Sequence, residues 1–164
     1  MPRLIVTDAN ILIDLAEIDQ HQLLFLPDWS TATTFDVFYE LRDKQKLSWQ
    51  PYIETGQLAL EEVPEELISQ IRSEVSSRLS DQDCTVIVLA ESHKAIILSG
   101  DRTIAMTYRK RGYETHGILW LLDENESTGR HQPAQLHEFL TAIMAVNDWL
   151  PANECKLRIE RWQP

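Results

Sequence analysis

The chain has 164 residues, which suits one domain with a single hydrophobic core. Its net charge of −11 disfavours broad, nonspecific nucleic-acid binding, which depends on basic side chains that neutralise phosphates. No apolar run reaches the roughly 20 residues that cross a bilayer, and the apolar start is too short for a secretory signal. The two cysteines, Cys84 and Cys155, are expected to be free thiols. Together with the missing signal and membrane segments, they predict a cytoplasmic protein.

The first half of the chain alternates predicted strands and helices. A buried strand over 3–7 ends at Asp8, and apolar residues at helical spacing predict a helix over 9–18. Pro64 and the two acids after it mark the start of another helix, which we expect to continue to 78. The remaining predicted elements are a Thr-rich strand at 30–34, a helix over about 35–46 and a strand at 58–63.

The second half continues the alternation. Ser80 is a candidate N-cap, and Gly112 is expected to end a helix. The predicted elements are a helix at 81–93, a strand at 95–99, a helix at 102–111, a strand at 114–116, a helix at 118–123, a polar loop at 124–132, and helices at about 133–149 and 154–161. Strands separated by helices predict a three-layer α/β/α sandwich with a mostly parallel sheet. We expect one domain over 1–164, with 132–164 as a C-terminal helical extension packed on it.

Four carboxylates fall at corresponding places in this predicted sheet. Asp8 and Asp101 each follow a strand. Glu40 lies one turn into the helix after another strand, and Asp83 lies in the first turn of its helix. Ligands of open α/β sheets bind beyond the carboxyl ends of the strands, so we expect the four acids to gather at one edge.

Such a gathering predicts a metal site. Neighbouring carboxylates raise one another's pKa, and Mg²⁺ or Mn²⁺ would compensate, because hard cations take carboxylate and water oxygens. A site of this kind can activate a water as nucleophile and neutralise the charge that builds on a phosphodiester. Each acid taken singly is better explained as a helix cap or dipole partner, whereas four at corresponding places favour the metal site.

Four short motifs in this order resemble the PIN-domain family, and within it the toxins of the VapBC type. The resemblance covers about 4–122. The motifs are VTDANILI at 6–13, TTFDVFYEL at 33–41, LSDQD at 79–83 followed by apolar residues at 86–90, and LSGDR at 98–102.

The resemblance implies a ribonuclease that hydrolyses RNA phosphodiester bonds with a water activated at the metal. It implies that one or two Mg²⁺ or Mn²⁺ ions are held by the four acids Asp8, Glu40, Asp83 and Asp101. Asn10 would orient the Asp8 carboxylate, and Ser99 would be the small hydroxyl that often precedes the last acid. A homodimer, and for a toxin an antitoxin protein that covers the site, are implied as partners.

Two positions have competitors. Asp81 competes with Asp83, and we prefer Asp83 because it lies seven residues before Ala90, as in the family's pattern. Asp36 competes less seriously with Glu40, since the Glu-Leu pair matches better.

Basic residues near the last acid, Arg102 and Arg109 among them, are candidate RNA-phosphate contacts, although a solvated helix end explains them equally well. The final helix carries Lys156, Arg158 and Arg161, which are either solvated charges or a partner surface.

Two other functions compete with the ribonuclease. A haloacid-dehalogenase-type phosphatase would need a second Asp where Asn10 stands. A PIN-fold module that binds RNA or protein without cutting keeps the same acids, and metal-dependent cleavage distinguishes it.

Overall fold

Alternating apolar strands and helices build a five-stranded, all-parallel sheet with the order β3-β2-β1-β4-β5 in the computed structural model, which describes residues 3–164. The predicted fold class is confirmed. The strands are β1 (Arg3–Thr7), β2 (Trp29–Thr34), β3 (Leu58–Glu61), β4 (Ile96–Leu98) and β5 (Thr115–His116). β1 lies in the middle, paired in parallel with both β2 and β4.

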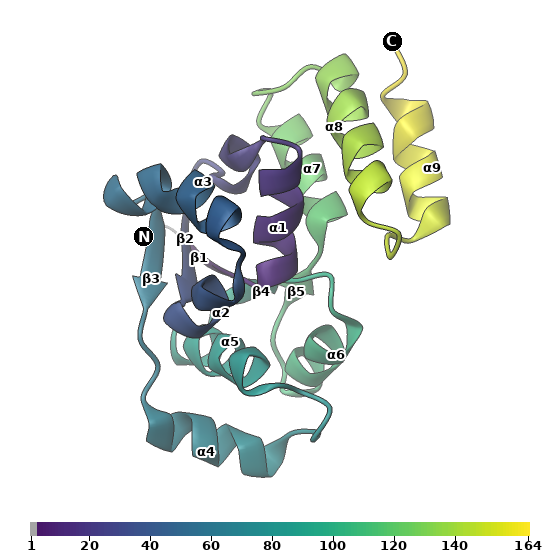
Figure 1. Cartoon of the computed structure of the whole chain (residues 1–164). Coiled ribbons are helices and arrows are strands. Elements are labelled where there is room, and N and C mark those ends of the chain that lie inside the picture. The colour runs from purple at the N-terminus through teal and green to yellow at the C-terminus, as the bar shows by residue number, and fades with distance from the viewer. Residues whose placement is uncertain (1–2) are drawn as a thin grey trace.

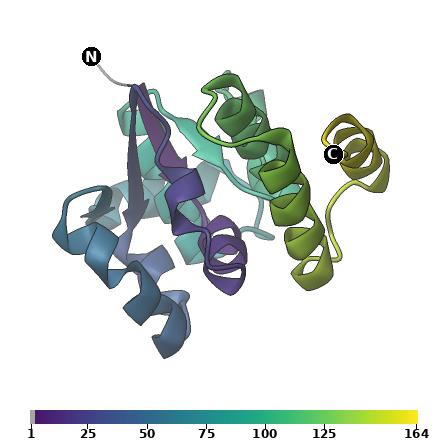
Figure 2. The same ribbon diagram turned by 90° about the horizontal axis from the view of Figure 1, so that it is seen from above.

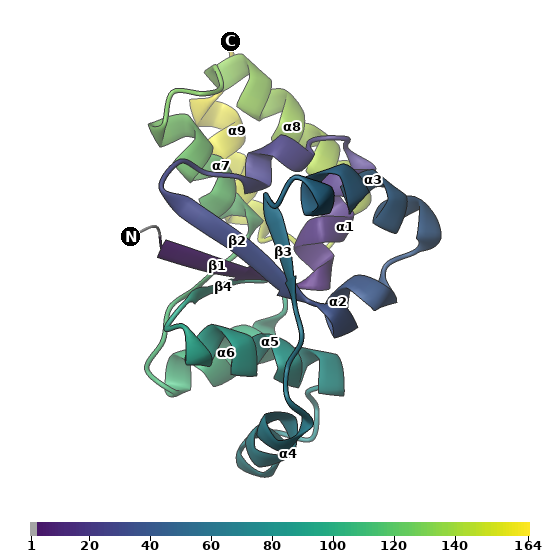
Figure 3. The same cartoon turned by 90° about the vertical axis from the view of Figure 1, so that its left-hand side faces the viewer.

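Helices cover both faces of the sheet (Figures 1 and 3). One layer holds α1 (Ala9–Glu17), the 3₁₀ turn η1 (His21–Leu24), α2 (Phe35–Glu40), α3 (Asp43–Glu54) and α7 (Ile118–Ser127). The other layer holds α5 (Asp81–Ser92) and α6 (Arg102–Lys110), with α4 (Glu65–Glu74) outside α5. Within residues 3–164, no helix has the length and apolar character needed to cross a membrane.

The last two helices, α8 (Pro133–Val146) and α9 (Ala152–Arg161), form an antiparallel pair outside α1 and α7 (Figure 2). Trp162, directly after α9, is fully buried, and its indole N–H donates to Glu126 of α7. Arg158 adds a two-pronged ion pair with Asp123, at 2.6 and 2.9 Å. The C-terminal pair is therefore attached to α7 by burial and by ion pairs.

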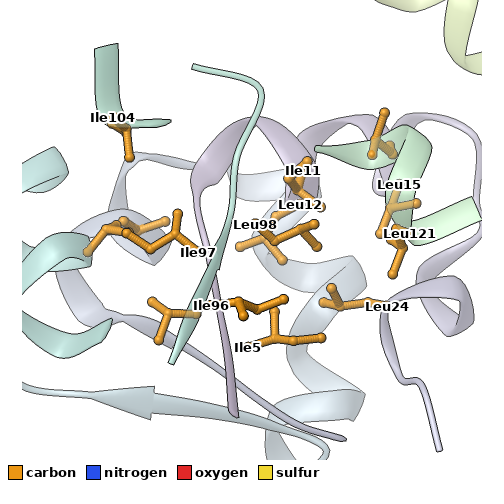
Figure 4. Close-up of a cluster of buried hydrophobic side chains, with 14 of the residues drawn as sticks. Ile5, Ile11, Leu12, Leu15, Leu24, Ile96, Ile97, Leu98, Ile104 and Leu121 are labelled. Atoms are coloured by element: carbon orange, nitrogen blue, oxygen red, sulfur yellow. The ribbon is translucent and has the colours of Figure 1, made fainter. Parts of the chain in front are cut away.

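The centre of the sheet is buried on both faces, as a parallel sheet between helix layers requires. Figure 4 shows Leu98 beside Ile11 and Leu12 of α1, while Ile97 lies on the side of Ile104 of α6. All of these side chains are at most 1% exposed. Neighbouring residues of a strand point to opposite faces, so Ile97 and Leu98 pack β4 between the two helix layers, and Ser99 follows directly at its carboxyl end.

Several predicted boundaries are wrong, among them the ends of the helix expected over 133–149 and of the strand expected over 58–63. Three errors are larger. The helix expected over 35–46 is two helices, because Leu41 is extended (φ −65°, ψ 151°) and buried in the core. The helix after Pro64 stops at Glu74, short of 78. The polar loop expected from 124 begins only after α7 ends at Ser127, because the buried Asn125 side chain donates to the carbonyls of Leu23 and Leu121.

Candidate functional site

Asp8 lies directly beyond the carboxyl end of β1. Thr7 pairs with Leu98 of β4, and the Asp8 amide donates to the Leu98 carbonyl at 3.0 Å. The same residue is the N-cap of α1, where Oδ1 accepts a 2.8 Å hydrogen bond from the Ala9 amide. Its position is thus determined by the strand on one side and by the helix start on the other.

A single hydroxyl connects Asp8 to Asp101. Ser99 Oγ donates to Asp8 Oδ2 at 2.9 Å and accepts from the Asp101 amide at 2.9 Å. Asp101 is the N-cap of α6, and its Oδ1 accepts from the amides of Thr103 and Ile104 at 2.8 and 3.1 Å. The ends of two adjacent strands therefore bring two carboxylates, 93 residues apart in the chain, to one place.

Asn10 supports the same loop by a different contact from the one expected. Its Oδ1 accepts a 3.0 Å hydrogen bond from the Gly100 amide. The hydrogen bonds to the Asp8 carboxylate come from the Ala9 amide and the Ser99 hydroxyl. Asn10 thus holds the backbone between Ser99 and Asp101, and orients the Asp8 carboxylate only indirectly.

Asp83 is held at the start of α5 by a reciprocal cap. The Asp83 amide donates to Ser80 Oγ at 3.1 Å, and the Ser80 amide donates to Asp83 Oδ2 at 2.9 Å. This is a capping box, in which two amides of the helix start are satisfied by two side chains. It confirms the predicted N-cap and determines the direction of the Asp83 carboxylate.

The helix that carries Glu40 is joined to α5 by two buried threonines. Thr34 Oγ1 caps α2 by accepting from the Val37 amide at 3.1 Å, and it lies 2.8 Å from Thr85 Oγ1 of α5. This hydroxyl pair brings the end of β2 against the first turn of α5, where Asp83 lies. Thr85 carries no sequence signal of its own, because only the fold shows that it is buried beside Thr34.

The charge of Asp83 links Asp8 on one side to Glu40 on the other. The pKa of Asp8 is raised from 3.8 to about 6. Burial is the largest cause and the charges of Asp83 and Asp101 add to it, while the hydrogen bonds from Ala9 and Ser99 act in the opposite direction. The pKa of Glu40 is also raised, first by partial desolvation and then by the charges of Asp83 and Asp36.

The competing acids have other roles. The Asp81 carboxylate accepts a 2.7 Å hydrogen bond from the Arg72 guanidinium, and its side chain is 79% exposed. Asp36 is exposed on α2 and acts on Glu40 by its charge. Asp83, in contrast, acts on both Asp8 and Glu40.

The two candidate RNA contacts lie at opposite ends of α6. Arg102 is exposed and follows Asp101 directly, at the carboxyl edge of the sheet. Arg109 lies in the last turn, and its guanidinium reaches the Thr115 carbonyl at 3.4 Å. Of the two, only Arg102 borders the acid cluster.

The acids suit a hard divalent cation by chemistry, although they do not form a closed cage. Among residues 3–164, no group of three or more His, Cys, Asp or Glu side chains is arranged so that it could hold a metal ion by itself. Mg²⁺ requires no such cage, because it keeps several waters and binds through one or two carboxylates together with substrate phosphates. In the described chain, Asp101 Oδ2 and Asp83 Oδ1 accept no hydrogen bond, so each acid keeps one oxygen for a ligand.

The family model DUF3368, described as a PIN domain, matches residues 4–164. The chain belongs to the PIN-domain family. This family has a nuclease-type fold, and its members typically use divalent metal ions. A search of the curated proteins finds no match.

Two solved structures are similar to this chain. PAE2754 from Pyrobaculum aerophilum is similar with a TM-score of 0.55 at 15% identity, over 77% of this chain and 99% of that one. A domain of a functionally unknown protein from Methanocaldococcus jannaschii is similar with a TM-score of 0.48 at 16% identity, over 70% of this chain and 90% of that one. At such identities the first likeness supports the fold and says nothing of substrate.

Proposed function

We propose that this PIN domain is a ribonuclease that hydrolyses RNA phosphodiester bonds with Mg²⁺ or Mn²⁺. The observation that carries the proposal is the Ser99 hydroxyl, which joins Asp8 to the backbone of Asp101 at the ends of adjacent strands. Glu40 and Asp83 lie close enough for their charges to interact, which makes a set of four oxygen-donor side chains. Oxygen ligands of this kind are those that hard divalent cations select.

Each residue has a distinct part in this proposal. Asp8, Asp83, Asp101 and Glu40 would hold the cation, one or two of them directly and the others through its bound waters. When bound, the cation supplies positive charge to the phosphodiester and lowers the pKa of a water. Ser99 keeps the Asp8 carboxylate in one orientation. Glu40 is exposed, and its pKa is raised by partial desolvation and by the charges of Asp83 and Asp36, a repulsion that a bound cation would offset.

An acidic chain can act on RNA if the local field at the site is reversed. A bound cation is the largest local charge in such a site and attracts phosphate where the bare carboxylates would repel it. Arg102, exposed at the start of α6 beside Asp101, would add a donor for a neighbouring phosphate.

The test is incubation of the purified protein with a pool of structured and single-stranded RNAs in Mn²⁺, Mg²⁺ or EDTA. Asp8→Asn serves as the inactive variant. Asp28→Asn serves as the matched control, because Asp28 is exposed at the amino end of β2, on the opposite edge of the sheet. We expect cleavage that requires metal, disappears in Asp8→Asn and persists in Asp28→Asn. RNA that is bound equally with and without metal and left intact would instead identify a binding module.

The toxin role extends the same proposal, supported by the order of the four motifs. We expect induced expression in a bacterial host to arrest growth, and Asp8→Asn to abolish the arrest. An antitoxin would be a small protein whose co-expression restores growth, and a homodimer would be seen by sedimentation. Normal growth with an active enzyme would contradict the toxin role and leave the ribonuclease in place.

A further inference from the structure

Two aromatic side chains lie exposed on the helix that carries Glu40. Phe35 is 36% exposed and Tyr39 is 65% exposed. Their ring centroids are 6.1 Å apart with an interplanar angle of 25°. Residues four apart lie on the same face of a helix, so the pair forms one aromatic surface. Val37 and Phe38, buried on the opposite side, attach the helix to the core.

This aromatic surface borders the acid cluster. Tyr39 precedes Glu40 directly, and the charge of Asp83 on α5 acts on Glu40. Figures 1 and 3 both show α2 beside α5 at the carboxyl end of β2. A chain whose phosphodiester reached the cluster would therefore have its neighbouring nucleotides within reach of Phe35 and Tyr39.

The surroundings of the pair are charged, with basic side chains among them. The Lys46 ammonium lies 5.5 Å from the centroid of the Tyr39 ring. Over positions 35–46 the chain holds three basic residues, Arg42, Lys44 and Lys46, and three acids, Asp36, Glu40 and Asp43. Protein interfaces are depleted of charge at their centre, so this border fits a phosphate-bearing ligand better than an apolar protein surface.

We propose that Phe35 and Tyr39 form a stacking platform for the unpaired bases that flank the phosphodiester bound at the acid cluster. The proposal rests on the proposed ribonuclease function of the neighbouring acids. Aromatic side chains beside basic ones are the usual means of binding single strands, because every base has a face that can stack. Paired bases in a duplex are already stacked and cannot present those faces.

The experiment measures stacking directly. An unstructured RNA of about 12 nucleotides with 2-aminopurine in its middle is titrated with the Asp8→Asn protein in Mg²⁺, since fluorescence of this base falls when it stacks. We expect quenching on binding. Tyr39→Ala in the same background should weaken binding roughly 5- to 100-fold and remove most of the quenching, and Phe35→Ala should act in the same direction. Tyr39→Phe keeps the ring and should restore both.

The matched control is Trp149→Ala, which removes an aromatic side chain that is 94% exposed in the loop between α8 and α9. It should leave both binding and quenching unchanged. A duplex of the same sequence should bind at least about 10-fold more weakly than the single strand. In the wild-type background, Tyr39→Ala should raise KM for single-stranded RNA more than it lowers kcat.

Failure of the platform and failure of the proposed function give different results. RNA that does not bind, equal binding of duplex and single strand, or unchanged quenching in both alanine variants overturns the platform. A variant that alters only sedimentation would show a surface between copies of the chain and would also overturn it. Metal-dependent cleavage with unchanged KM in Tyr39→Ala leaves the nuclease without the platform. Quenching without cleavage leaves the platform without the nuclease.

Discussion

The Ser99 hydroxyl donates a 2.9 Å hydrogen bond to Oδ2 of Asp8, a residue 91 positions earlier in the chain. Ser99 Oγ also accepts a hydrogen bond from the Asp101 amide, so one small side chain sets the positions of two acids. Both Ser99 and Asp8 are buried, so water cannot easily replace the bond if it is lost.

Ser99→Ala is expected to reduce metal affinity or cleavage by about 10- to 100-fold, because groups that orient metal ligands commonly contribute that much. The free energy of unfolding should fall by about 1–2 kcal/mol, since Asp8 and the Asp101 amide each lose a partner. Metal titration and denaturant unfolding measure the two effects. Ser92→Ala, which removes a serine hydroxyl at the end of α5, is the control. Equal activity in both variants would contradict the role of Ser99.

Asp8→Asn is expected to abolish cleavage while the metal-free protein remains folded and becomes slightly more stable at neutral pH. The asparagine can still accept from the Ala9 amide and can donate its amide to Ser99 Oγ, so the local hydrogen bonds survive. What disappears is a buried negative charge close to two other carboxylates. Thermal unfolding and the cleavage assay test this together. Residual cleavage at the wild-type rate would remove Asp8 from the site.

The metal-free protein is expected to lose stability as the pH rises from about 4 to above 6. With a folded pKa of about 6 against 3.8, Asp8 keeps its proton in the folded state where the unfolded chain has released it, so raising the pH favours unfolding. The contribution of Asp8 is about 3 kcal/mol at most. Unfolding in EDTA across this range should show the decline in wild type relative to Asp8→Asn, and Mg²⁺ above pH 6 should reverse it. Parallel profiles of the two proteins would disprove the coupling.

Asp83→Asn should lower cleavage by at least about 100-fold, whereas Asp81→Asn should leave it within about 2-fold of wild type. Asparagine keeps the acceptor oxygen of the capping box with Ser80, so a loss of activity in Asp83→Asn reports on charge and not on the helix start. Asp81→Asn weakens only an exposed ion pair with Arg72. The reverse ranking of the two variants in the cleavage assay would make Asp81 the third acid.

Trp162→Ala should lower the free energy of unfolding by about 3–5 kcal/mol, because it removes a fully buried side chain between α9 and α7. Trp149→Ala, which changes a side chain that is 94% exposed, should cost less than about 0.5 kcal/mol. Denaturant unfolding of both variants compares them directly. If the two behave alike, the C-terminal pair is not integral to the domain.

Much of the fold follows from local patterns. The apolar run before Asp8 and the apolar stretch 95–99 predict the two central strands, because a strand buried on both faces reads as a continuous apolar segment. Ser80 with Asp83 three positions later predicts a capped helix start, since both partners lie within one turn. Asp8 and Asp101 each follow a strand, and the carboxyl ends of parallel strands lie at the same edge of a sheet. This rule alone predicts that the two acids lie close together.

The sequence by itself thus determined the elements, the parallel sheet and the approximate place of the acids, because caps and hydrophobic periodicity depend on neighbours within a few positions. Only the tertiary structure decided that α2 ends at Glu40, that Asn10 accepts a hydrogen bond from the Gly100 amide, and that Tyr39 stays exposed beside the acids. These outcomes depend on burial and on hydrogen bonds between residues as far as 91 positions apart, which no local pattern encodes.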